Sequence, residues 1–370
     1  MQIDYSQKKH IPVLDGIRGL AILLVLIFHL FDYIPITKIG WIGVDLFFVL
    51  SGFLITGILL NTKDSPNYYQ SFIIRRALRI FPLYYGFLVF FMIIVPFTSL
   101  SQSITDYDYL TEHQVYYWFY LQNWLASFDQ NWPTGNAISH LWSLAVEEQF
   151  YLLWPFVVYF LSHKQIKTCC IAIVILAILI RNLLIFNQLS WVAPYINTLA
   201  RFDSLAIGAL LVIYIRYNKE FIEKYISKFL LVTGVLFISI LIIIKANGGH
   251  NPLLLTNPIM QSIGFTVIGF FFAALIAISL QKNGKAPAFF SNPPLLFLGK
   301  YSYGLYVYHS VLDKLFFNEI YTALGANGIT SNILTSLSIL ASSVILSYIS
   351  FHYYEKHFLK FKKLVVVKLI

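Results

Sequence analysis

The sequence predicts an all-α polytopic membrane protein with about ten transmembrane helices and both termini in the cytoplasm. The first observation is the composition: 58% of the 370 residues are hydrophobic and only 12% are charged. Soluble domains average about 25% charged residues, so the composition excludes an ordinary soluble enzyme, a disordered chain and a disulfide-rich scaffold. The second observation is a series of apolar stretches of about 20 residues, the length that crosses a bilayer as a helix. The third is the uneven placement of Lys and Arg.

Runs such as Ala21 to Phe28 and Leu230 to Ile244 are apolar on every face, which indicates helices, because the strands of a membrane barrel alternate in polarity. The expected spans are residues 13–31, 42–60, 80–98, 147–162, 168–187, 197–216, 229–246, 258–280, 296–318 and 331–353. The first span follows two lysines, as a signal peptide would. However, Arg18 interrupts it and no small-residue cleavage site follows. We therefore interpret it as the first transmembrane helix.

The placement of positive charge predicts the orientation, because Lys and Arg concentrate in cytoplasmic loops. Alternate connections hold most of the 26 Lys and Arg residues, whereas the opposite connections hold only Lys38 and Lys245. This partition places both termini in the cytoplasm. It also explains the net charge of +9 as a topology signal with attraction to anionic membrane lipid. Nucleic acid is not an expected partner.

The domain organisation is simple: one transmembrane domain over residues 1–355 and a basic cytoplasmic tail over residues 356–370. The outer loop at residues 97–146 is rich in aromatic residues and has no Lys or Arg. Its rings suit an aromatic belt at the membrane interface, or a platform that stacks on sugars outside the cell. Cys169 and Cys170 are adjacent, which favours packing residues over a disulfide or a metal site.

Two ionisable residues share one face of the first span. Arg18 and His29 are eleven residues apart, about three helical turns, which separates them by about 16 Å along the helix axis. Taken singly, Arg18 is explained by snorkelling to the inner headgroups and His29 by hydrogen bonding in the core. Ionisable groups inside spans usually face a bundle interior or a wet cavity. The pair therefore favours a polar path from the cytoplasm toward the outer third of the bilayer.

The predicted topology sorts the other ionisable residues by depth. The outer half of the bundle collects Asp45, Glu147, Glu148, Arg201 and His309. The inner half collects four arginines: Arg18, Arg75, Arg76 and Arg79. Simpler explanations stay open, because carboxylates favour a helix N-terminus and arginines anchor a span on its cytoplasmic side.

Six motifs occur in order along the chain: LDGIRGLAILLVLIFH, GVDLFFVLSGFLIT, RRALRIFPLYY, SHLWSLAVEEQFYLLWP, ARFDSLAIGALL and GKYSYGLYVYH. The first holds Arg18 and His29 with ten residues between them. In this order and spacing the chain resembles the membrane-bound acyltransferase family 3, whose members O-acylate sugars on the outer side of bacterial membranes. The resemblance covers residues 13 to about 310. Longer members carry a hydrolase-like domain after the tenth span, which we do not expect here.

The resemblance implies a multi-pass protein of the bacterial inner membrane. The acyl donor would be acetyl-CoA or another acyl-CoA, and the acceptor an extracytoplasmic carbohydrate hydroxyl, with no permanently bound cofactor and no metal. The arginines at 18, 75, 76 and 79 suit the donor's phosphates through charge-assisted hydrogen bonds. His29 is the expected general base, although a nucleophile that carries the acyl group is an alternative.

Partners for His29 are also expected from this set. Asp45 or Glu147 would orient the imidazole, as carboxylates do in triads, and Glu148 is a further candidate catalytic carboxylate. Arg201 or His309 would stabilise the oxyanion. Two other functions compete: a transporter of a glycan or small anion, since many carriers have buried charges, and a noncatalytic scaffold. No inverted repeat is evident, and the motif set favours the acyltransferase.

Overall fold

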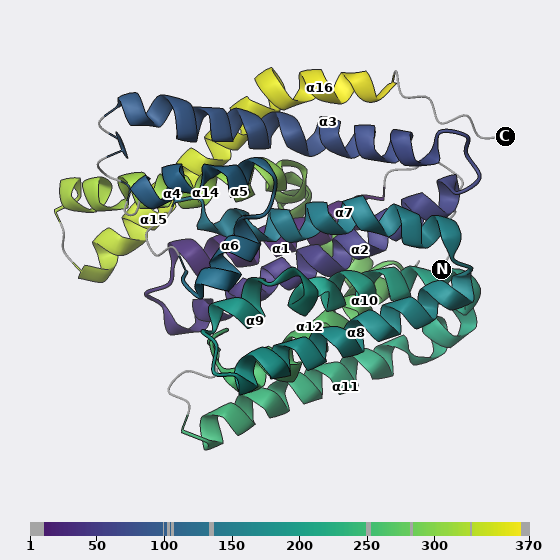
Figure 1. Cartoon of the computed structure of the whole chain (residues 1–370). Coiled ribbons are helices and arrows are strands. Elements are labelled where there is room, and N and C mark those ends of the chain that lie inside the picture. The colour runs from purple at the N-terminus through teal and green to yellow at the C-terminus, as the bar shows by residue number, and fades with distance from the viewer. Residues whose placement is uncertain are drawn as a thin grey trace.

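The computed structural model describes residues 11–98, 100–101, 104, 107–132, 137–248, 253–281, 284–325 and 328–363. Within these ranges all regular elements are helical (Figure 1). The long helices are α1 (Pro12–Leu30), α2 (Ile42–Thr62), α3 (Tyr68–Val89), α7 (Trp142–Phe160), α8 (His163–Phe186), α10 (Thr198–Tyr217), α11 (Lys219–Ala246), α12 (Phe265–Ser279), α14 (Pro293–Ala323) and α15 (Gly328–Ser350). The all-α polytopic class is confirmed.

Shorter helices connect the long ones. They are α4 (Tyr107–Glu112), α5 (Gln114–Trp118), α6 (Gln122–Asp129), α9 (Val192–Ile196), α13 (Lys285–Phe290) and α16 (Lys356–Lys360). Short 3₁₀ or π segments extend several helices, among them η1 (Pro35–Trp41), η5 (Ser139–Leu141), η7 (Phe351–Glu355) and η8 (Phe361–Lys363). The expected outer loop therefore contains α4, α5, α6 and η5.

Eight helical segments of the described chain are long and apolar enough to cross a membrane. The two other expected spans, residues 147–162 and 296–318, correspond to α7 and α14, which carry more polar residues. Their crossing of the membrane, and with it the count of ten, stays a prediction. The expected span at residues 80–98 is the later part of a longer helix, because α3 begins at Tyr68. Arg75, Arg76 and Arg79 thus lie on the helix and not in a connection.

The helices differ in how deeply they are buried. The segments Pro35–Thr62 and Val192–Tyr217 bury 72% and 78% of their span residues, whereas α8 and α11 bury only 22% and 17%. Figure 1 shows α8 and α11 along one edge of the bundle, and α3 with α16 along the opposite edge. The helices α1, α2 and α10 thus form the centre, and α8 and α11 present their apolar side chains to lipid.

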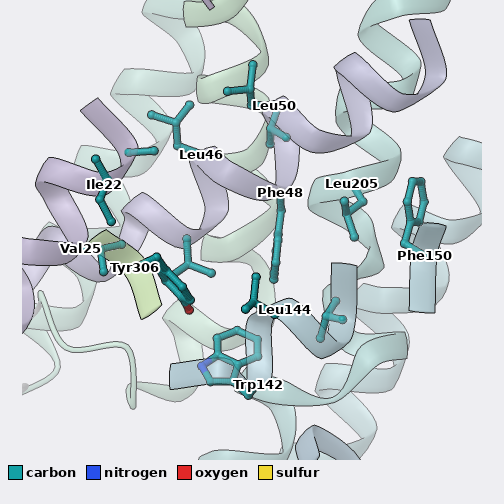
Figure 2. Close-up of a cluster of buried hydrophobic side chains, with 14 of the residues drawn as sticks. Ile22, Val25, Leu46, Phe48, Leu50, Trp142, Leu144, Phe150, Leu205 and Tyr306 are labelled. Carbon is teal, nitrogen blue, oxygen red and sulfur yellow. The ribbon is translucent and has the colours of Figure 1, made fainter. Parts of the chain in front are cut away.

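Close helix crossings hold the centre together. A Cβ atom at Gly299 of α14 would lie 1.9 Å from the carbonyl oxygen of Asp15 in α1, and one at Gly52 of α2 would lie 1.9 Å from that of Leu205 in α10. Small residues of this kind let membrane helices approach at backbone distance. Apolar side chains such as Val25, Phe48 and Tyr306 then fill the space where the helices meet (Figure 2).

Candidate active site

Two histidines from opposite ends of the sequence meet where α1 packs on α14. His309 Nε2 lies 3.3 Å from His29 Nδ1, and the ring centroids are 4.9 Å apart. His29 is half-buried and His309 is fully buried. The sequence placed both histidines in the outer part of the bundle. In the structure they are in direct contact.

The backbone bonds of both rings determine where their protons lie. His29 Nδ1 is 3.0 Å from the carbonyl oxygen of Val25, and His309 Nδ1 is 2.9 Å from that of Leu305. A carbonyl oxygen only accepts, so each Nδ1 carries a proton. His309 Nε2 is then unprotonated and accepts from His29 Nδ1–H. It follows that His29 Nε2 is the nitrogen with a lone pair for a substrate proton.

His29 lines a cavity of about 350 Å³ with a strongly aromatic wall. We call it the outer cavity; its aromatic lining is Phe28, Trp41, Trp132, Trp142, Trp191, Tyr195 and Tyr306, with His29 and His140. Trp132 of the outer loop stacks on Trp191 with 5.6 Å between the rings. Ser310 and Lys314 add polar groups. Flat rings beside a few polar groups are a surface on which a sugar ring can stack.

Other aromatic residues of the outer loop are structural. Trp118 stacks on Tyr85 of α3 at an interplanar angle of 6°. Trp124 Nε1 donates a hydrogen bond to Gln149 of α7. The loop is thus folded onto the bundle, and only part of its aromatic surface faces the cavity.

His140 is a member of the site that the sequence analysis missed. Its ring centroid lies 5.2 Å from that of His309 and 5.2 Å from that of Tyr306. The Tyr306 hydroxyl donates to the carbonyl oxygen of His140 at 2.6 Å and lies 2.5 Å from Ser143 Oγ, from which it accepts. The available signal was its position in the motif SHLWSLAVEEQF, two residues before Trp142.

An inner cavity of about 100 Å³ lies next to the outer one, and both are lined by Val44 and Tyr306. Three of the predicted arginines reach the inner cavity: Arg18, Arg76 and Arg79. Tyr306 therefore separates an arginine-lined space from the histidine pair. Arg18 and His29, on one helix, line successive cavities, which agrees with their predicted common face.

Glu147 lines the inner cavity. It was expected to orient the His29 imidazole, but it does not lie beside His29. Its two carboxylate oxygens accept hydrogen bonds from Ser51 Oγ at 2.9 Å and from the Tyr151 hydroxyl at 2.8 Å. Arg76 lies over the Tyr151 ring, 5.5 Å from its centroid. The carboxylate thus belongs to a polar network on the arginine side of Tyr306.

Asp45 and Arg201 bind each other and not the histidines. Arg201 Nη2 lies 2.7 Å from Asp45 Oδ1, and both side chains are fully buried. Ser204 Oγ also donates to Asp45, and the guanidinium carbon of Arg201 lies 4.3 Å from the Phe265 ring centroid. The structure therefore corrects the expectation that Asp45 orients His29. Through these contacts, Arg201 of α10 joins α2 and α12 in the interior of the bundle.

Two further candidates lie outside the cavities described so far. Glu148 Oε1 is buried and has no hydrogen-bond partner among the described residues. Arg75 lies on α3 but does not line the inner cavity. Neither residue is placed beside His29. Within the described ranges, no group of three His, Cys, Asp or Glu residues is arranged to hold a metal ion.

The helical frame, with a histidine pair beside two adjoining cavities, is that of a polytopic membrane protein. The chain belongs to the family described as "Acyltransferase domain", whose family model matches residues 11–352. It is 29% identical over 319 residues to the peptidoglycan O-acetyltransferase OatA of Listeria monocytogenes, covering 82% of this chain and 49% of that one. It is 31% identical over 323 residues to the O-acetyltransferase OatA of Staphylococcus aureus, covering 81% and 50%.

The chain thus spans about half the length of these curated relatives. No solved structure matches it. The family and the described helices identify a multi-pass membrane protein.

Proposed function

We propose that this protein transfers an acyl group from a cytoplasmic acyl-CoA to a hydroxyl group of an extracytoplasmic carbohydrate. The observation that carries the proposal is the contact between His29 and His309 at the wall of the aromatic outer cavity. A histidine whose Nε2 lone pair faces no competing described donor suits a general base at neutral pH. The relatives are named O-acetyltransferases, and one is named for peptidoglycan, so acetyl and a cell-surface polysaccharide are the expected groups.

In the proposed reaction, acyl transfer takes place in one step, with His29 as the general base. The acceptor hydroxyl gives its proton to His29 Nε2 as its oxygen attacks the thioester carbonyl carbon. The C–S bond then breaks, the ester forms, and the CoA sulfur takes the proton back from His29 as the thiol leaves. His309 Nε2 holds the Nδ1 proton of His29, which keeps the reactive tautomer in place. It is a positioning residue here, because both of its nitrogens are engaged.

A two-step version of the mechanism uses the same residues. His29 Nε2 would attack the thioester and release the thiol, and the acceptor hydroxyl would then attack the acyl-imidazole. The two versions differ in one observable. Donor alone leaves an acyl group on His29 only in the two-step version, which mass spectrometry of the quenched protein would detect.

The donor assignment rests on the inner cavity. Arginines bind phosphates through charge-assisted hydrogen bonds, and Arg18, Arg76 and Arg79 line this space on the predicted cytoplasmic side. We expect Arg76→Ala to raise the KM for acyl-CoA more than the KM for the acceptor. The opposite ranking in steady-state kinetics would remove the donor from this cavity.

The decisive experiment measures free thiol released from acetyl-CoA by the purified protein in lipid, with and without cell-envelope glycan. Wild type is compared with His29→Ala and with Lys228→Ala, a control at an exposed lysine of α11. We expect glycan to stimulate release in wild type and in the control, and not in His29→Ala. Absence of release with every acyl-CoA tested would contradict acyl transfer from CoA and favour transport.

A further inference from the structure

A second cavity on the predicted cytoplasmic side adjoins the inner cavity. We call it the tail cavity, because Phe351, Glu355 and Leu359 of the C-terminal segment form one of its walls. Its volume is about 510 Å³, against about 100 Å³ for the inner cavity. Both cavities are lined by three common residues: Arg18, Arg79 and Tyr303. A wide space therefore leads into a narrow one that ends at Tyr306.

The tail cavity holds more positive charge than its carboxylates neutralise. Its wall contains the cations Arg18, Arg79 and Lys300 and the carboxylates Asp15 and Glu355. Asp15 is paired with Arg18 at 2.6 Å, and Glu355 accepts from Ser350 Oγ at 3.1 Å. Three cations against two carboxylates leave one positive charge in excess. Arg79 interacts with the charge of Glu355, so Lys300 is the cation that is left for a ligand.

The described contacts of Lys300 are aromatic. Its Nζ lies 4.9 Å from the Tyr301 ring centroid and 5.3 Å from that of Phe351. A cation–π contact at an exposed site is weaker than a charge-assisted hydrogen bond. Lys300 is thus a cation at the cavity wall that a phosphate would satisfy better.

A lysine of the C-terminal tail lies near the arginines of α3, next to the wall of the tail cavity and not in it. Lys362 lies in η8, which packs beside α3. Burial and, after it, the nearby charges of Arg79, Arg76 and Arg75 together lower the pKa of Lys362 to about 7. Positive charges that lie close together in the folded protein repel one another, and a bound anion would offset this repulsion. Cations from α3, α14 and the tail therefore converge on one side of the bundle.

We propose that the tail cavity binds the phosphorylated nucleotide end of the acyl donor, with Lys300 and Lys362 as phosphate-binding residues. The phosphates then lie at the junction where Arg18 and Arg79 line both cavities. From there the narrow inner cavity, beside Arg76, receives the thin pantetheine arm and brings the thioester toward Tyr306 and His29. The inference rests on the proposed acyl-CoA donor. It adds two lysines and the C-terminal helix to a donor site that the motif arginines alone do not complete.

The test is direct binding to the purified full chain in nanodiscs of zwitterionic lipid. The ligands are CoA, 3′-dephospho-CoA and pantetheine, and the proteins are wild type, Lys300→Gln, Lys300→Arg, Lys362→Gln and the control Lys228→Ala. Loss of a charge-assisted hydrogen bond is worth about 1.5–3 kcal/mol, roughly tenfold or more in affinity. We expect that loss for CoA in both Gln variants, partial recovery in Lys300→Arg, and unchanged pantetheine binding.

The outcomes separate the inference from the function on which it rests. If wild type does not bind CoA, the donor assignment fails. If wild type binds CoA and the Gln variants bind it equally well, only the tail cavity assignment fails. Anionic lipid headgroups offer the same phosphate chemistry, so the titrations are repeated with phosphatidylglycerol in the nanodisc. Gln variants that lose phosphatidylglycerol binding and keep CoA binding would assign the two lysines to lipid and overturn the proposal.

Discussion

The contact between His29 and His309 is the feature on which reactivity depends at the scale of single residues. His309→Leu removes one of the two acceptors for the His29 Nδ1 proton and leaves only the Val25 carbonyl oxygen to hold the imidazole in its tautomer and orientation. General acid–base catalysis contributes about 10²–10⁴-fold, and we expect kcat to fall by about 10²-fold with little change in the donor KM. Steady-state thiol release is the measurement.

His309→Gln is the matched variant, because its amide oxygen can still accept a hydrogen bond. We expect it to retain more of the wild-type kcat than His309→Leu. Equal losses in the two variants, with equal falls in thermal unfolding temperature, would mean that His309 only fills space.

The buried pair Asp45–Arg201 carries a different prediction. Removing one partner leaves an uncompensated buried charge, which costs about 3–5 kcal/mol. We expect Asp45→Leu to lower the thermal unfolding temperature of the protein in lipid. The double variant Asp45→Leu with Arg201→Leu should recover part of that loss. A stable single variant that lacks only turnover would instead place Asp45 in the chemistry.

Helical arithmetic predicted the common face of Arg18 and His29, because their separation depends on one helix alone. It did not predict that Asp45 binds Arg201 or that His140 lies beside His309. These contacts join residues far apart in the chain. Sequence and topology give the depth of each side chain, and only the packing of helices gives its partner.

At the scale of elements, the crossing of α2 and α10 depends on the absence of a side chain at one point. A Cβ at Gly52 would lie 1.9 Å from the carbonyl oxygen of Leu205, so the two backbones must separate to admit it. We expect Gly52→Ala to reduce the yield of folded protein and its thermal unfolding temperature. Gly234→Ala in α11 is the control, because its Cβ would lie 3.7 Å from Phe271.

If the Gly52→Ala and Gly234→Ala proteins were equally stable, α10 would be able to shift away from α2 without a loss of folding free energy. The expected loss follows from the rigidity of both helices here, since Gly52 and Leu205 are buried in the centre of the bundle. Packed interiors absorb such overlap poorly.

The start of α3 illustrates what apolar patterns do not predict about an element. An apolar window begins at Ile80, but the helix begins at Tyr68. Its first turns carry arginines, and those at 76 and 79 line the inner cavity. A helix whose polar side faces a cavity has no need of an apolar sequence there, so hydropathy alone sets the boundary too late.

At the scale of the whole molecule, the same reasoning applies to α7 and α14. These helices contain Glu147, Glu148, Lys300 and His309, and they supply walls of the cavities. Alternation of Lys and Arg along the chain requires both to cross the membrane, although neither is among the eight segments that are long and apolar enough to do so by length and composition. Whether each of these helices crosses the membrane determines the orientation of all later helices in the chain.

Cysteine labelling tests the crossing of both helices in a background with the two native cysteines replaced by alanine. Phe128→Cys precedes α7 and Lys164→Cys follows it; Lys285→Cys precedes α14 and Leu324→Cys follows it. All four positions are exposed.

With ten spans, a membrane-impermeant maleimide added to intact cells should label the cysteines at 128 and 324. The cysteines at 164 and 285 should be labelled only after permeabilisation. Labelling of the cysteine at 164 in intact cells would mean that α7 does not cross. The arginines of the inner cavity lie on α1 and α3, before α7, so their side is reported by the cysteine at 128. Labelling of that cysteine only after permeabilisation would place the arginine-lined cavities on the side opposite to acyl-CoA, and the donor could then not reach His29 from the cytoplasm.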